Sequence, residues 1–187
     1  MKTNRNNTKP LSTSRFPKPL SWLSTLIIAS TLWYCHSHQK ANETATPLEV
    51  IMKVRQAAML LSQQGKEALT TLRDSNSSFT WKDSYVFVVN CSADLVLANP
   101  AFPEREGGDI LQHLDYQGKQ YGVELCEAAN PKGAWIQYSW PKPGDQKPQR
   151  KISYLISVPG QPYQVGAGIY DSTYTLQELN EMILSSP

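Results

Sequence analysis

The spacing of apolar residues changes after the first predicted helix of this chain, and that change limits the folds open to it. Over residues 47–73 apolar side chains recur at spacings of three and four, the period of one helix face. After residue 84 the pattern becomes that of strands: residues 85–91 form a continuous β-branched and aromatic run, and the apolar residues between Ile152 and Val158 alternate. The sequence therefore predicts an α+β domain with a long N-terminal helix.

The predicted helix over residues 47–73 carries its own start signal. Thr46 suits the N-cap, Pro47 suits the first helical position, and Glu49 stands where a capping box places an acid. At 1.5 Å per residue the helix is roughly 40 Å long. We favour packing of its apolar stripe on the protein's own sheet. The alternative is a coiled-coil partner and thus a homodimer through this helix. The stripe comprises Ile51, Val54, Ala58, Leu61, Gly65, Ala68 and Leu72.

Antiparallel β-sheet follows this helix. About five strands are predicted, over residues 85–91, 95–98, 134–140, 151–158 and 163–170. Residues 99–108 contain two prolines and two glycines and are predicted to form a loop. Shorter helices are predicted over residues 109–114 and 121–129, and a C-terminal helix over residues 175–184.

Three segments resemble the single Cache domain, type 2. They are Gly133 to Pro143 (GAWIQYSWPKP), Lys151 to Ile156 (KISYLI) and Gly166 to Tyr170 (GAGIY). Residues 85–90 and 94–100 resemble the first hairpin of that family, although Asn99 stands where the family often has His. The resemblance covers about residues 48–184 and implies a PAS-like sheet with an extracytoplasmic pocket for small organic ligands, often carboxylates.

The resemblance also implies a role in sensing or signalling, because such domains often sit in chemoreceptors or histidine kinases. We expect a domain that binds a small organic acid, has no output domain of its own and acts with a membrane-protein signalling partner. The alternative is a structural or partner-binding protein that kept the Cache shape without a functional ligand pocket.

Residues 1–37 have the layout of a targeting segment, in which basic residues precede an uncharged apolar stretch. That stretch is short for a bilayer span of roughly 20 residues, which favours a cleaved signal peptide over an uncleaved anchor. A lipoprotein at Cys35 is a third alternative, against which the bulky Tyr34 argues. We expect a linker over residues 38–47 and one domain over residues 48–185. The protein is then periplasmic or otherwise extracytoplasmic, either secreted or tethered to the inner membrane.

The charge outside this segment argues against nucleic-acid binding. Five of the 18 Lys and Arg precede residue 19, which leaves 13 against 16 acids, or a net charge of about −3. No broad basic field remains to hold a phosphate backbone. The five basic residues are Lys2, Arg5, Lys9, Arg15 and Lys18.

Aromatic residues on the predicted strands are the candidate ligand contacts, because rings supply apolar walls and oriented polar groups. Lys151 is added as a cation that would neutralise a carboxylate. The alternatives are core packing for each ring and solvation for Lys151. Strand alternation places Lys151 and Tyr154 on opposite faces unless a bulge intervenes. The ligand-binding candidates are Tyr138, Trp140, Lys151, Tyr154 and Tyr170.

Cys91 and Cys126 leave two alternatives open. In an oxidising compartment they would form a disulfide that closes a loop of about 35 residues; otherwise they are buried free thiols. No G-x-S-x-G motif is present, and His113 is the only histidine after the linker. We therefore expect no catalytic residue, no metal and no cofactor, and hence no enzyme.

Overall fold

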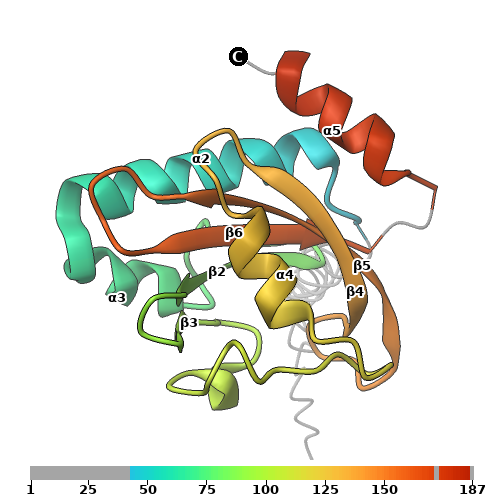
Figure 1. Cartoon of the computed structure of the whole chain (residues 1–187), viewed down its shortest axis with the longest axis horizontal. Coiled ribbons are helices and arrows are strands. Elements are labelled where there is room, and N and C mark those ends of the chain that lie inside the picture. Colours follow the sequence, from blue (N-terminus) through green and yellow to red (C-terminus); the bar gives the residue numbers. More distant parts are fainter. Residues whose placement is uncertain (1–42, 171–172, 186–187) are drawn as a thin grey trace, which may run out of the picture. The chain divides into compact units, whose positions relative to one another are not determined.

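The computed structural model describes residues 43–170 and 173–185, so the expected targeting segment over residues 1–37 and the linker residues before Glu43 lie outside the described part. The elements, in chain order, are α2 (Pro47–Gln64), the 3-10 turn η1 (Gly65–Glu67), α3 (Ala68–Arg73), β1 (Thr80–Trp81), β2 (Ser84–Asn90), β3 (Leu95–Ala98), the 3-10 turn η2 (Pro103–Arg105), α4 (Tyr121–Ala128), β4 (Ala134–Pro141), β5 (Pro148–Ser157), β6 (Gln164–Ile169) and α5 (Leu176–Ser185) (Figure 1).

The strands form one six-stranded antiparallel sheet, which confirms the predicted antiparallel sheet. Its order is β1-β2-β6-β5-β4, and β3 also pairs with β2. The sixth strand, beyond the five predicted, is the two-residue β1. The first long strand, β2, pairs with the last, β6, so that Phe87 lies opposite Gly166. This pairing brings residues from distant parts of the chain to the middle of the sheet.

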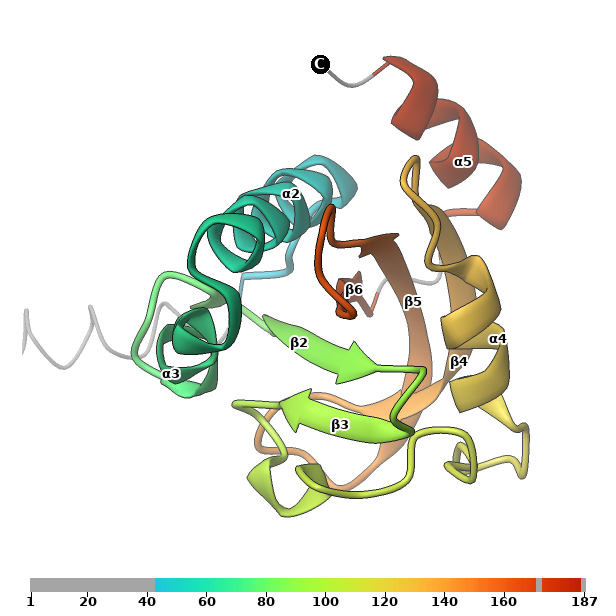
Figure 2. The ribbon, with the colours of Figure 1, turned by 60° about the vertical axis from the view of Figure 1, so that its left-hand side comes forward.

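Helices α2 and α3 cover one face of the sheet. Helix α4 and the loop before it cover the other face (Figure 2). On β2, Val86 and Val88 pack in the cluster that contains the apolar stripe of α2. Tyr85 and Phe87 point to the other side, toward the cluster that contains Leu125 of α4. Because both faces are covered, nearly all of β2 is buried.

The long N-terminal helix is confirmed, but the chain breaks it at Gly65. That residue adopts a φ of 58°, and its N–H donates to the Leu61 carbonyl before a 3-10 turn leads into α3. Glycine takes this conformation without the cost of a Cβ. The capping box is confirmed as well, since Thr46 N–H donates to Glu49 Oε2 at 2.9 Å and Glu49 N–H donates to Thr46 Oγ1 at 3.3 Å. No helix in the described ranges is both long and apolar enough for a bilayer crossing.

The helix predicted over residues 109–114 is wrong, because these residues form turns. The hydrogen bonds that would continue a helix have other partners here. Gln120 Nε2 donates to the Leu111 carbonyl at 2.8 Å, and Asp115 N–H donates to the Lys119 carbonyl at 2.8 Å.

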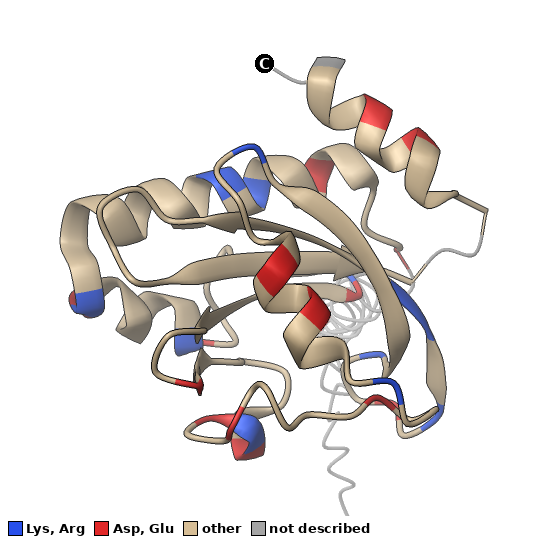
Figure 3. Ribbon diagram, viewed as in Figure 1, with Lys and Arg blue, Asp and Glu red and all other residues tan. Residues whose placement is uncertain are grey.

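Charges of both signs are spread over the described elements (Figure 3). Both charged residues of α4 are acidic, Glu124 and Glu127, and so are both of α5, Glu178 and Glu181. This distribution agrees with the mildly negative balance expected for the domain and differs from the basic face that nucleic-acid binding requires.

Candidate functional site

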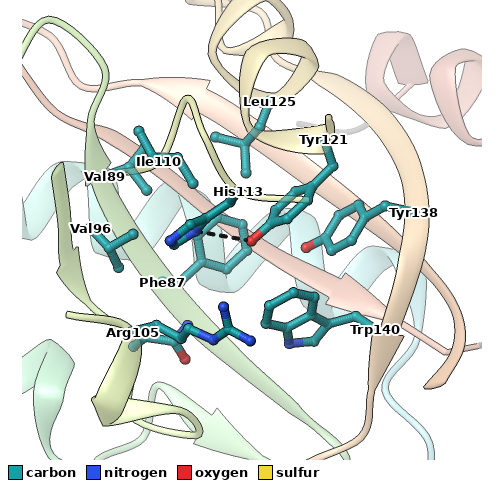
Figure 4. Close-up of a pocket in the computed structure, with 11 residues that line it drawn as sticks. Phe87, Val89, Val96, Arg105, Ile110, His113, Tyr121, Leu125, Tyr138 and Trp140 are labelled. Carbon is teal, nitrogen blue, oxygen red and sulfur yellow. Dashed lines mark hydrogen bonds between the residues drawn. The ribbon is translucent and has the colours of Figure 1, made fainter. Parts of the chain in front are cut away.

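A small cavity lies between the sheet and the loop over residues 99–120 (Figure 4). Its volume is about 20 Å³, which corresponds to the space of about one ordered water molecule. The walls combine apolar residues of β2 and β3, rings of β4 and α4, and polar residues of the loop. The lining residues are Phe87, Val89, Val96, Asn99, Arg105, Ile110, His113, Tyr121, Leu125, Tyr138 and Trp140.

Aromatic rings form one wall of the cavity. Tyr121 stacks on Tyr138, with ring centres 4.6 Å apart and planes 14° apart, and Trp140 lies 5.4 Å from Tyr121. Burial raises the pKa of both tyrosines, so each hydroxyl is neutral at physiological pH and is able to donate a hydrogen bond. The Tyr138 hydroxyl lies 3.0 Å from Ser153 Oγ, and that of Tyr121 lies 3.4 Å from Nδ1 of His113.

Arg105 supplies the positive charge of the cavity. It extends from η2 toward Trp140, and its guanidinium carbon lies 5.1 Å from the ring centre (Figure 4). The pKa of His113 is lowered by burial and by the charge of Arg105, although Asp109 and Asp94 oppose the shift. His113 is therefore neutral near pH 7, which leaves the guanidinium as the cation among the lining residues.

Sequence reasoning missed both Arg105 and His113, because the loop over residues 99–120 shows no periodicity. Without the wrongly predicted helix over residues 109–114, the length of that loop would have been a usable signal. Connections longer than about 12–15 residues without secondary structure of their own are uncommon and are often functional. The loop runs from Asn99 to Gln120 and contains only the three-residue η2.

Lys151 is buried in a cage of aromatic rings, with only 1% of its surface exposed. Its Nζ lies 4.1 Å from the ring centre of Tyr85, 5.4 Å from those of Phe87 and Tyr170, and 5.9 Å from that of Tyr138. Burial lowers the pKa of Lys151 to about 7, and the charge of the Asp83 carboxylate only partly offsets this. The expectation of a solvated Lys151 is therefore wrong.

Lys151 does not line the cavity, yet it contacts two rings that do, those of Phe87 and Tyr138. Tyr138 and Trp140 line the cavity directly, whereas Tyr170 contributes to the Lys151 cage and donates to the Pro141 carbonyl at 2.6 Å. These four candidates thus share one face of the sheet.

The placement of Tyr154 in this pocket is corrected by the structure. Tyr154 lies on the opposite face of β5, where its ring centre is 5.4 Å from that of Trp135 and its hydroxyl donates to the Lys132 carbonyl at 3.0 Å. No bulge interrupts the pairing of β5 with β4 or β6, so strand alternation separates Tyr154 from Lys151.

Asp115 fastens the loop to the edge of the sheet. Its carboxylate accepts from the backbone N–H of Ser139, Gln117 and Lys119, at 2.8, 2.8 and 2.9 Å. Burial by itself would raise the pKa of Asp115, but these three donors lower it below its ordinary value. The carboxylate is therefore charged at neutral pH and holds the loop in place.

A disulfide joins Cys91 to Cys126, with a Cα–Cα distance of 5.8 Å. Of the two alternatives left open by the sequence, the structure has the bonded one. Cys91 follows β2, and Cys126 lies on α4 next to the lining residue Leu125. The bond thus ties one wall of the cavity to the sheet. Within the described ranges, no group of three or more His, Cys, Asp or Glu residues is arranged to hold a metal ion.

The model of the single Cache domain 2 family matches residues 36–178 of the chain. The chain belongs to this family. Among curated relatives, this Cache domain is 30% identical over 89 residues to the sensor histidine kinase MctS of Rhizobium johnstonii and 26% identical over 109 residues to the methyl-accepting chemotaxis protein McpP of Pseudomonas putida. The matched segments are 48% and 58% of this chain, but only 19% of each relative.

Solved structures share the fold of this Cache domain. A methyl-accepting chemotaxis protein from Vibrio parahaemolyticus aligns with a TM-score of 0.53 and 18% identity, over 79% of this chain and 96% of that one. A Cache chemosensory domain solved for the structural basis of carboxylic acid recognition aligns with a TM-score of 0.52 and 21% identity, over 75% of this chain and 97% of that one. Both likenesses show that the chain shares the fold of these domains.

Proposed function

We propose that this Cache domain binds a small organic acid outside the cytoplasm and takes part in sensing or signalling. The observation that carries the proposal is the unpaired cation at the cavity. Among residues 43–170 and 173–185, no carboxylate forms an ion pair with Arg105, although Arg105 lines the small cavity beside Trp140. A planar guanidinium is well suited to bind a carboxylate through two parallel hydrogen bonds.

The other lining residues fit the rest of a short acid. Val89, Val96, Ile110 and Leu125 supply apolar contacts, and the neutral Tyr121 hydroxyl supplies a donor. The cavity of about 20 Å³ is smaller than a ligand of several heavy atoms. Binding therefore requires the turn that carries Arg105 to move outward, while the Asp115 contacts and the disulfide hold the loop and α4.

The relatives support a signalling context. One relative is a sensor histidine kinase and another is a chemotaxis protein, and one structural neighbour was solved for carboxylic acid recognition. By analogy, this domain works in the periplasm with a membrane-protein signalling partner, and its role is recognition without catalysis.

A second candidate function is a structural or partner-binding role without a functional pocket. The small cavity favours it, because the rings themselves fill most of the space. So does the outer face of α2, where Leu48, Met52 and Met59 are 54%, 52% and 56% exposed. On this proposal the α2 face is the surface of a homodimer.

A binding screen separates the two candidates. The folded domain is heated with acetate, propionate, pyruvate, amino acids or alkylammonium salts, and hits are measured by calorimetry. A true ligand at about 100 times its dissociation constant adds about 2.7 kcal/mol of stability. We expect stabilisation by at least one organic acid. Absence of any stabilisation, together with dimerisation that depends on protein concentration, would support the partner-binding role instead.

A further inference from the structure

The cage around Lys151 has the architecture of a site for a ligand's ammonium group. The rings of Tyr85, Phe87, Tyr138 and Tyr170 surround one nitrogen, with centroid distances between 4.1 and 5.9 Å. Proteins bind alkylammonium ligands in this way, because the negative faces of the rings attract a cation that has left water. Here the nitrogen inside the cage belongs to the protein itself.

Among residues 43–170 and 173–185, no carboxylate forms an ion pair with this nitrogen. Within the same residues, its hydrogen-bond partner is the Tyr85 hydroxyl, at 3.1 Å. The nearby Asp83 carboxylate is engaged elsewhere, accepting from Ala45 N–H at 2.8 Å and from Lys142 Nζ at 2.9 Å. The rings are therefore the principal surroundings of the amino group.

The backbone of β6 leaves space for the aliphatic part of the Lys151 side chain at Gly168. A Cβ at Gly168 would lie 2.8 Å from Lys151 Cε and 2.5 Å from Ser153 Oγ, closer than real Cβ atoms approach. Ser153 is itself held at 3.0 Å from the Tyr138 hydroxyl. Glycine at this position thus leaves the passage through which the side chain enters the cage.

We propose that Lys151 fills an ammonium-binding cage with its own amino group. The filled cage makes the pocket selective for organic acids that carry no amino group. The inference rests on the proposed function and narrows its ligand class. An amino acid or amine finds the cage, which adjoins the cavity through Phe87 and Tyr138, already filled, and its positive charge meets that of Arg105. An acid such as propionate carries no group that needs the cage.

Chemical rescue tests whether the cage binds ammonium groups. Lys151→Ala removes three methylenes and the amine, which together match n-propylammonium. We expect n-propylammonium chloride to raise the unfolding temperature of Lys151→Ala, and to leave the wild type and Lys151→Met unchanged. Sodium chloride and 1-propanol are the matched controls for salt and for shape. Lack of rescue in a folded Lys151→Ala protein, or equal rescue by 1-propanol, would overturn the cage assignment.

Two measurements on the wild type keep the inference testable if Lys151→Ala does not fold. In proton NMR, the ε-methylene protons of one lysine should lie upfield because of the ring current of Tyr85; ordinary shifts for all lysines contradict the cage. In calorimetry, propionate should bind at least tenfold more tightly than alanine, and equal affinities contradict the specificity role.

These outcomes separate the inference from the proposed function. If the wild type binds no acid but propylammonium rescues Lys151→Ala, the cage stands and the acid-sensing role fails. If acids bind and rescue fails, the cage assignment fails alone.

Discussion

Arg105 lies over Trp140, with 5.1 Å between the guanidinium carbon and the ring centre, and so links the loop above the cavity to strand β4. Such a contact is worth about 0.5–2 kcal/mol, depending on how far it is removed from water. It is weak enough to open for a ligand and specific enough to place a cation at the cavity. The predictions below depend on this arrangement and on the groups behind it.

Arg105→Gln should lower the affinity for an acid identified in the screen at least tenfold, or by about 1.4 kcal/mol. The reason is loss of the guanidinium that pairs with the carboxylate. Titration calorimetry measures the change. Glu104→Gln is the matched control, because Glu104 lies exposed in the same turn and outside the lining, and its affinity should not change. Unchanged affinity in Arg105→Gln would rule out this residue as the carboxylate partner.

Asp115→Ala should lower the free energy of unfolding by about 1–3 kcal/mol, because it leaves the buried Ser139 N–H without its acceptor. Since the pKa of Asp115 is lowered in the folded state, its contribution is present at neutral pH and is lost as the pH falls through that pKa. Urea unfolding at neutral and acidic pH measures both effects. Asp145→Ala, in an exposed turn, should cost much less. Similar losses in the two variants would contradict the anchoring role.

Replacing both Cys91 and Cys126 with Ala should lower stability by about 3–4 kcal/mol in the chain-entropy model, for a sequence separation of 35 residues. The same loss should follow reduction of the wild type. Denaturant unfolding with and without reductant gives the comparison, and intact mass after alkylation reports the bond. Alkylation of both cysteines without reductant would show that the bond is absent.

The stability of the wild type relative to Lys151→Met should rise with pH above neutral. Lys151 has a folded pKa of about 7, below its ordinary value of 10.5, so between these values the unfolded chain binds more protons. The slope is at most about 1.4 kcal/mol per pH unit. The facing Tyr85, Tyr138 and Tyr170 have raised pKa values and stay neutral over this range, and Asp83 is present in both proteins.

Urea unfolding at about pH 6 and about pH 9 tests this prediction, because titrations shared by the two proteins cancel in the difference. The same difference in stability at both values would contradict the lowered pKa of Lys151 in the folded protein.

Much of the fold could be predicted because helices and strands each require apolar residues at a characteristic spacing along the sequence. The spacings of three and four around Val54 and Leu61 indicated α2, and β3 was predicted with its observed bounds, Leu95–Ala98. The break at Gly65 was missed because the apolar stripe continues across it, and a positive φ leaves no trace in hydropathy. Residues 109–114 were assigned wrongly because residues outside the segment, Gln120 and Lys119, take the hydrogen bonds that a helix would form between Leu111 and Asp115.

The sequence alone determined the α+β class, the family and the strands that carry Tyr138 and Trp140, since each depends on residues that are neighbours along the chain. Only the tertiary structure decided the surroundings of Lys151 and the position of Arg105. The cage rings come from β2, β4 and the end of β6, and Arg105 comes from a loop without periodicity. The pKa of a buried amine depends on which distant groups exclude water from it, and that follows from packing rather than from local order.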